Sequence, residues 1–189
     1  MDTRGIMKKL IFLILLLPTL CFAWTVQDAH KAVIGRMGVE EACTPLTDSF
    51  ITNPSMEDDS ADWADSGTVT TNEQSASQDN TGGGCQYSRH IVTSNQWAGV
   101  QQYPLDASPT NGVTYDVTCY VYPVSGVVKF YDTASNCDIT NSTSTSGTGS
   151  WESITGSCTG NGSAEGIKII TSSADGAEFY VDDCTWVAR

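Results

Sequence analysis

The chain has 189 residues, of which 22 are acidic and 9 basic, giving a net charge of −13 at pH 7. A chain this acidic repels nucleic acid and anionic membrane surfaces, which excludes both classes of partner. Its length suits one domain with one core.

Residues 1–23 have the layout of a secretory signal peptide. Lys8 and Lys9 precede an unbroken apolar run at residues 10–17, and a small residue, Ala23, ends the segment. The run is too short for a membrane helix, which needs roughly 20 residues. We therefore expect a secreted or extracellular protein, in the periplasm or at the cell surface as alternatives, with no membrane insertion after cleavage.

Residues 24–42 differ in pattern from the rest of the chain. Apolar side chains recur there at helix-like spacing, and Gly35 and Gly38 limit the length of any helix. The segment is predicted to be a short helix or arm, and either an interaction arm or a loosely ordered N-terminus fits the pattern.

The cysteines indicate disulfides. Six remain after the signal segment: Cys43, Cys85, Cys119, Cys137, Cys158 and Cys184. An even number in an exported chain predicts three disulfides, whose pairing the sequence leaves open. No CxxC motif suggests zinc, and a bond between Cys137 and Cys158 would join the ends of a Ser/Thr/Gly-rich loop.

From residue 43 to residue 189 the pattern is β. Short runs rich in Val, Ile, Thr, Tyr and Phe alternate with clusters of Gly, Asn, Ser and Asp. Strands are predicted at 48–53, 85–93, 97–105, 113–122, 126–132, 150–158, 165–172 and 178–187, with long loops at 64–84 and 133–149. This number of strands predicts an all-β fold, a two-sheet β-sandwich or jelly roll.

Alternation along the strands assigns their faces. The side chains predicted to point into the core are Val113, Tyr115, Val117, Cys119, Val121, Val128 and Phe130. Tyr120, Tyr122, Lys129 and Tyr131 then point outward. Trp63 and Trp151 are expected to pack in the core or at a sheet edge.

Several motifs follow one another in a recognisable order. They are Asn53-Pro54-Ser55-Met56-Glu57 followed by Trp63, then Trp97-Ala98-Gly99-Val100-Gln101-Gln102, then a strand containing Thr114-Tyr115, then Trp151, and last Phe179-Tyr180-Val181-Asp182-Asp183. This order resembles the carbohydrate-binding modules of the galactose-binding-like jelly-roll type, especially the group containing families four and nine. The resemblance covers about residues 48–187.

The resemblance implies a structural calcium ion. In that family the early Glu and the late Asp meet in space, which would make Glu57 and Asp182 ligands, with Asp183 as a substitute. Calcium takes six to eight oxygen ligands, and carboxylates supply them readily. The alternative is that these acids are solvated at strand ends.

The resemblance also implies a polysaccharide or glycan as the ligand. Sugars offer flat C–H faces and many hydroxyls, so a site needs exposed aromatic rings with polar neighbours. The candidate ligand-binding residues are Trp97, Gln101, Tyr120, Tyr122, Lys129 and Tyr131, all of outward parity. Tyrosines on a strand are also ordinary sheet surface.

Catalysis is not expected. Asp182 and Asp183, like Asp58 and Asp59, are neighbours on an extended chain and should point to opposite faces, so neither pair can flank a glycosidic bond. The sequence thus predicts a secreted, non-catalytic carbohydrate-binding domain. The alternative is a structural or adhesive surface subunit, such as a filament, capsid or virion component, in which copies of the chain assemble.

Overall fold

The computed structural model describes residues 43, 47–48, 50–58, 62–80, 85–131, 139–140 and 142–189. The chain divides into two units, Met1–Glu41 and Ala42–Arg189, and every described residue belongs to the second. The expected signal peptide (1–23) and arm (24–42) lie outside the described residues. Within the described part, no helix is long and apolar enough to span a membrane.

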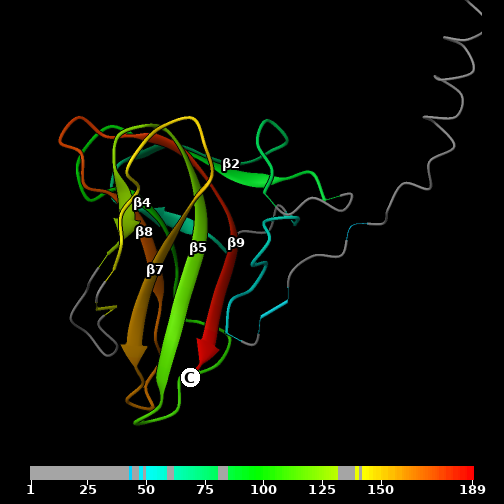
Figure 1. The fold of residues 1–189 in the computed structure, drawn as a ribbon, viewed down its shortest axis with the longest axis vertical. Helices are drawn as coiled ribbons and strands as arrows, with labels where there is room; N and C mark the ends of the chain where they lie inside the picture. Colours follow the sequence, from blue (N-terminus) through cyan, green and yellow to red (C-terminus); the bar gives the residue numbers. More distant parts are fainter. Residues whose placement is uncertain are drawn as a thin grey trace, which may run out of the picture. The chain divides into compact units, whose positions relative to one another are not determined.

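The described residues form an all-β sandwich of two antiparallel sheets (Figure 1). The strands are β1 (Ala64–Ser66), β2 (Val69–Ser75), β3 (Ser88–Thr93), β4 (Gly99–Gln102), β5 (Thr114–Ser125), β6 (Val128–Phe130), β7 (Glu152–Thr159), β8 (Ile167–Thr171) and β9 (Glu178–Ala188). One sheet has four strands in the order β1-β4-β8-β6, and the other has five in the order β2-β3-β9-β5-β7. The predicted fold class is confirmed.

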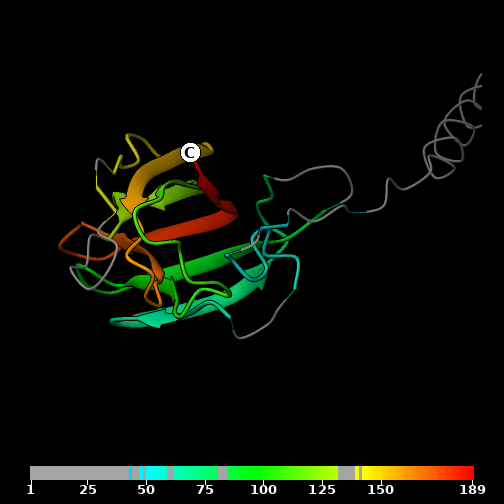
Figure 2. The ribbon, with the colours of Figure 1, turned by 90° about the horizontal axis from the view of Figure 1, so that it is seen from below.

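The five-stranded sheet places the last strand in its middle. Figure 2 shows its order from β2, drawn in teal, to β7, drawn in orange-yellow. β9 pairs with β3 on one side and with β5 on the other, so it joins two parts of the sheet that are distant in sequence.

The core fills the space between the sheets and follows the predicted alternation. Tyr115, Val117, Cys119 and Val121 of β5 are buried there, with Val128 and Phe130 of β6 among the residues that face them across the core. Trp63 is 1% exposed, as expected of a packing residue. Each large apolar side chain buried in this way contributes about 1.5–3 kcal/mol to folding.

The strand predicted at residues 48–53 does not form, because a side chain takes the backbone donors there. The Asp48 carboxylate accepts hydrogen bonds from the backbone N–H groups of Phe50 (2.7 Å) and Ile51 (3.1 Å). Its second oxygen accepts the Trp186 N–H at 2.8 Å, which docks the segment against β9. Local side-chain to backbone bonds of this kind compete with sheet pairing.

The long loop predicted at residues 64–84 is also wrong, because it contains β1 and β2. β2 reads Val-Thr-Thr-Asn-Glu-Gln-Ser and lies at the sheet edge, where only one side needs a partner strand. Its central Asn72 is tied inward, since its amide donates to the carbonyl of Trp63 at 2.8 Å. Because an edge strand can carry many polar residues, the sequence of β2 resembles that of a loop.

Disulfides are present as predicted. Cys43 bonds to Cys85, and Cys119 bonds to Cys184. Cys158 is disulfide-bonded as well, while its expected partner, Cys137, lies outside the described residues. Bonds of this kind persist in oxidising compartments and are rare in the cytosol.

Candidate functional site

Four ring-bearing side chains form a line across the outer face of the five-stranded sheet. His90 pairs in register with Tyr180, and Tyr180 pairs with Tyr122. Trp151 directly precedes β7 and comes next in line, because Val121 pairs with Glu152. We call His90, Tyr180, Tyr122 and Trp151 the aromatic row. At about 4.8 Å per strand, three steps give it a length of about 14 Å.

The rings of the aromatic row support one another. His90 stacks on Tyr180 with centroids 4.5 Å apart and an interplanar angle of 15°. Tyr122 meets Tyr180 edge-on at 6.3 Å and Trp151 edge-on at 5.7 Å. Such pairs contribute about 0.5–1.5 kcal/mol each beyond the area they bury. The row is therefore pre-ordered, with Tyr180 only 8% exposed and the other three side chains half-buried.

Polar groups surround this surface. The two ring nitrogens of His90 lie 3.2 Å from a Glu178 oxygen and 3.7 Å from a Glu73 oxygen. Tyr120 projects from β5 two residues before Tyr122 and is 39% exposed. The face thus combines aromatic rings with hydroxyl and carboxylate groups.

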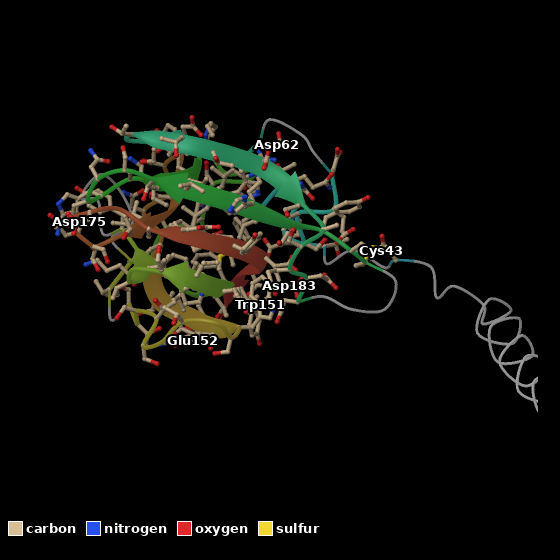
Figure 3. All side chains as sticks on the ribbon, turned by 90° about the horizontal axis from the view of Figure 1, so that it is seen from above. Cys43, Asp62, Trp151, Glu152, Asp175 and Asp183 are labelled. Atoms are coloured by element: carbon tan, nitrogen blue, oxygen red, sulfur yellow. A yellow bond between two sulfur atoms is a disulfide. The ribbon has the colours of Figure 1, made fainter. Side chains whose placement is uncertain are left out.

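Trp151 is held in place by the turn before it. The Glu152 carboxylate accepts the backbone N–H groups of Ser146 (2.8 Å) and Gly147 (3.0 Å), and the bond from Ser146 is the main reason that the pKa of Glu152 is lowered. The N–H of Gly149 donates to the carbonyl of Pro123 at 2.8 Å. Figure 3 labels Trp151 and Glu152 at the start of β7. Trp151 is half-buried on the outer face beside β7, the edge strand of this sheet, which agrees with the predicted packing in the core or at a sheet edge.

The segment after β2 contacts Asp182, the next outward-facing residue of β9 after Tyr180. Asp182 of β9 is fully buried, although its parity is outward. Its carboxylate accepts the backbone N–H groups of Asn80 (2.9 Å) and Asp183 (2.8 Å). Burial raises the pKa of Asp182 to about 7, and the neighbouring Asp183 carboxylate adds to the rise.

A β-bulge brings Asp182 and Asp183 together. Asp183 has a φ of 46° and is the extra residue of β9, opposite the step from Thr118 to Tyr120. The Asn80 amide donates to Asp183 at 2.9 Å, so both carboxylates bind the same residue. The expectation that the two side chains point to opposite faces is therefore wrong.

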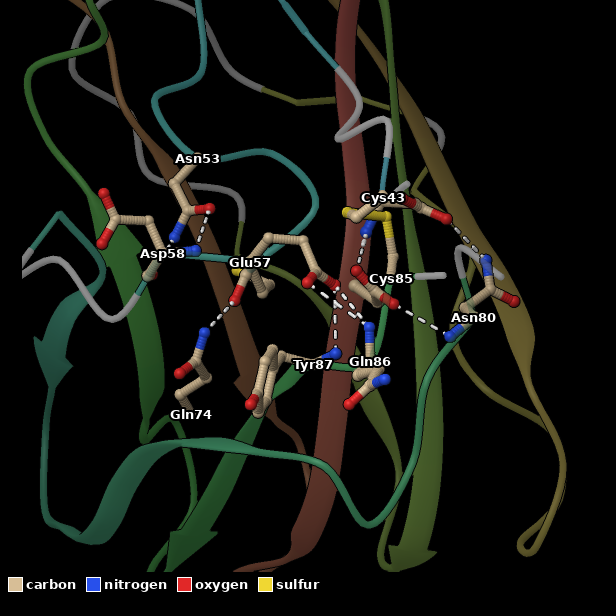
Figure 4. The surroundings of a disulfide bond; sticks show 12 residues. Cys43, Asn53, Glu57, Asp58, Gln74, Asn80, Cys85, Gln86 and Tyr87 are labelled. Atoms are coloured by element: carbon tan, nitrogen blue, oxygen red, sulfur yellow. Dashed lines mark hydrogen bonds between the residues drawn. A yellow bond between two sulfur atoms is a disulfide. The ribbon is translucent and has the colours of Figure 1, made fainter. Parts of the chain in front are cut away.

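Glu57 has other partners. Its carboxylate accepts the N–H groups of Tyr87 (3.0 Å) and Gln86 (3.2 Å), beside the Cys43–Cys85 disulfide (Figure 4). Among the described residues, its oxygens form a close group with the two bonded cysteine sulfurs and not with both Asp182 and Asp183. The three predicted calcium ligands are thus not gathered at one point.

A second cluster lies on the outer face of the four-stranded sheet. The Trp97 and Tyr131 rings are 6.0 Å apart, the Lys129 ammonium lies 5.1 Å from the Trp97 centroid, and the Lys168 ammonium lies 5.8 Å from the Tyr131 centroid. We call Trp97, Lys129, Tyr131 and Lys168 the tryptophan–lysine patch. Cation–π contacts at exposed positions contribute about 0.5–1 kcal/mol each.

The predicted ligand-binding residues therefore do not form one site. Tyr120 and Tyr122 lie outward on the five-stranded sheet. Gln101 and Lys129 lie outward on the four-stranded sheet, with Trp97 and Tyr131 at the ends of its strands. The outward faces of the two sheets lie on opposite sides of the sandwich. Strand alternation identifies outward side chains but not their sheet, so the prediction combined residues of two separate surfaces.

Sequence analysis missed His90, Tyr180, Trp151 and Lys168. Alternation could have found His90 and Tyr180, since core residues are their neighbours along the strand: Ile91 follows His90, and Phe179 and Val181 flank Tyr180. Their gathering depends on which strands are neighbours. That order is set by the long-range pairing of β9, which has no local signal in the sequence.

No protein-family model matches the sequence, and no curated protein matches it. Among solved structures, the xylan-binding domain CBM22-1 of Paenibacillus barcinonensis Xyn10C is similar, with a TM-score of 0.54, 14% identity, and coverage of 71% of this chain and 90% of that one. TmCBM61, solved in complex with β-1,4-galactotriose, has a TM-score of 0.51, 18% identity, and coverage of 75% and 99%. The C-terminal family 22 carbohydrate-binding module of Clostridium thermocellum Xyn10B has a TM-score of 0.53, 14% identity, and coverage of 76% and 97%. The chain thus has the two-sheet β-sandwich fold of carbohydrate-binding modules.

Proposed function

We propose that this protein is a non-catalytic domain that binds a glycan across the outer face of its five-stranded sheet. The observation that supports this proposal is the aromatic row, in which rings from three neighbouring strands and from the residue before a fourth lie in register. The similar modules named above include one described as xylan-binding and one solved with a galactotriose.

The chemistry of the row suits a sugar chain. Aromatic rings stack on the C–H faces of pyranoses, and hydroxyl, amide and carboxylate groups take up the sugar hydroxyls. Tyr120 and Tyr122 offer hydroxyls, and Glu73 and Glu178 offer carboxylates beside His90. An elongated row of about 14 Å favours an oligosaccharide over a single sugar.

The test is binding of the oxidised protein to a panel of neutral polysaccharides, measured by affinity electrophoresis and calorimetry. Trp151→Ala and Tyr122→Ala should each weaken binding about tenfold, which corresponds to about 1.4 kcal/mol for one lost ring contact. The unfolding midpoint of each variant reports whether the fold is retained.

Trp97→Ala is the matched control, because it removes an exposed aromatic side chain from the opposite sheet. It should leave the affinity for neutral glycans unchanged. Full binding by a folded Trp151→Ala/Tyr122→Ala double variant would exclude the aromatic row as the site.

We also propose a structural calcium ion, held by Asp182 and Asp183. Asp182 is fully buried beside the Asp183 carboxylate, and burial raises its pKa to about 7, so a bound cation would favour its charged form. Oxygen ligands from carboxylates and carbonyls fit calcium. Glu57 does not share this arrangement, so the pair is the proposed centre of the site.

The disulfides support a location outside the cytoplasm, which we also propose. The alternative function, a structural or adhesive surface subunit, stays a prediction. It requires self-association that survives dilution, which analytical ultracentrifugation of the full chain measures, and it is compatible with glycan binding.

A further inference from the structure

The positive charge of the sandwich is distributed unevenly. From residue 43 onward the sequence contains four Lys and Arg residues, namely Arg89, Lys129, Lys168 and Arg189. Arg89 is buried and bound to Asn72, and Arg189 pairs with Asp116 at 2.6 Å. Among the described residues, no carboxylate lies within 4.0 Å of either lysine ammonium, and both lysines belong to the tryptophan–lysine patch.

The patch is built in an ordered way on neighbouring strands. Lys129 of β6 pairs with Ile170 of β8, two residues from Lys168, so both lysines have outward parity. The N–H of Tyr131 donates to the carbonyl of Lys168 at 3.0 Å, which places the Tyr131 ring beside that lysine. Ile170 is fully buried, although it also faces outward, so the patch covers its own apolar base.

Trp97 is presented to solvent at a cost in backbone strain. It is 47% exposed and has a φ of 66°, a left-handed conformation that bulky residues avoid. Its N–H donates to the carbonyl of Thr171 at 2.9 Å, which fixes the turn before β4. Strain held by the surrounding structure is typical of binding sites.

We propose that the tryptophan–lysine patch is a second glycan site, specific for a sugar that bears a carboxylate, as a uronic acid does. Such a sugar offers an apolar ring face for Trp97 and a carboxylate for Lys129 or Lys168. The site lies on the opposite side of the sandwich from the aromatic row, so it goes beyond the function proposed above and does not depend on it.

The overall charge of the protein restricts further the class of acidic glycan that this patch can bind. The net charge of −13 repels a dense polyanion, whereas salt at physiological strength screens charges more than about 8 Å apart. Two lysines at diagonal positions on neighbouring strands, about 7–8 Å apart at the backbone, suit single carboxylates spaced along a neutral chain. The ligand expected is therefore a neutral polysaccharide with uronic-acid substituents.

The test compares glucuronoxylan with the same polymer after chemical reduction of its carboxylates to alcohols. The wild-type protein should prefer the acidic polymer, and Lys129→Gln/Lys168→Gln should lower the affinity for it about tenfold, to that for the reduced polymer. Arg189→Gln is the control for charge, because it removes one positive charge at a site outside the patch, where Arg189 pairs with Asp116. It should keep the preference, and so should Trp151→Ala.

Three results would overturn the proposal. The wild-type protein could bind both polymers equally or bind neither. Arg189→Gln could lose the preference as fully as the lysine variant, which would indicate a general charge effect. The lysine variant could abolish self-association of the protein with no change in its polymer preference, which would make the patch a contact between copies of the chain. Failure of the aromatic row to bind neutral glycans leaves this comparison intact.

Discussion

Asp182 is a buried carboxyl group whose charged form is disfavoured in the folded protein. It is fully buried, and burial together with Asp183 raises its pKa from 3.8 to about 7. A carboxyl group with a raised pKa in the folded state favours folding while it stays protonated. Its contribution is complete below about pH 4 and is lost as the pH rises to about 7.

Replacing Asp182 by the isosteric Asn should remove this dependence. In a chelator, the free energy of unfolding of the wild-type protein should fall relative to that of Asp182→Asn as the pH rises from about 4 to about 7. The difference is about three pKa units at about 1.4 kcal/mol each, so on the order of 4 kcal/mol. Urea unfolding at several pH values measures it, and parallel curves for the two proteins would contradict it.

Calcium supplies the control for the proposed metal site. At pH 7.5, millimolar calcium should raise the unfolding midpoint of the wild-type protein and leave that of Asp182→Asn nearly unchanged, since a ligand that binds only the folded state stabilises it. Glu57→Gln is the matched variant and should keep the response, because Glu57 binds the Gln86 and Tyr87 backbone instead.

Residue roles were predictable where strand alternation decides them. Val117, Cys119 and Val121 are buried as their parity requires. Trp151 was assigned to packing and not to the ligand-binding residues; it comes just before β7, after a turn anchored by Glu152. The carboxylates of Asp182 and Asp183 lie close together because of a β-bulge, which could not be predicted from the strand sequence.

Among the elements, β9 is the central strand of the five-stranded sheet. It pairs with β3 and β5 and is covalently tied to β5 by the Cys119–Cys184 disulfide. Its Trp186 N–H donates to the Asp48 carboxylate, and its Cys184 N–H donates to the carbonyl of Pro54. The disulfide lies beside the bulge, within the core.

Cys119→Ala/Cys184→Ala should therefore lower the free energy of unfolding by about 4 kcal/mol. The bond closes a loop of 65 residues in the unfolded chain, and its loss also leaves unfilled volume in the core. Urea unfolding measures the change. Cys43→Ala/Cys85→Ala is the comparison, and a smaller loss is expected because Cys43 is only half-buried. A loss below about 1 kcal/mol for the first pair would contradict this account.

Prediction of the elements succeeded for strands with clear alternation and failed at the edges. β5, β7, β8 and β9 lie within a few residues of their predicted positions. β2 was missed because an edge strand tolerates polar residues, and the strand at 48–53 was predicted where Asp48 binds the backbone instead.

At the scale of the whole molecule, the two candidate surfaces face opposite ways. The aromatic row lies on the five-stranded sheet and the tryptophan–lysine patch on the four-stranded sheet. Alternation correctly identified outward side chains on both sheets. It could not show that they belong to different sides, because sheet membership depends on long-range pairing.

If both surfaces bind glycan, one molecule can join two polysaccharide chains. Adding the protein to dilute glucuronoxylan should raise the viscosity of the solution, with a maximum at intermediate protein concentration. Trp151→Ala and Lys129→Gln/Lys168→Gln should each abolish the rise while keeping binding through the other face. A rise that persists in either variant would contradict two-sided binding.

The position of β9 also has a consequence for the timing of folding. Until β9 has emerged from the ribosome, the sheet can form only as two separate parts, β2 paired with β3 and β5 paired with β7. The strand that joins these two parts, β9, is still absent. Both pairs then present an open edge, the kind of edge that invites pairing with other chains. The five-stranded sheet, and with it the aromatic row, can be completed only after every other strand has emerged, so those edges stay unpaired until β9 is released.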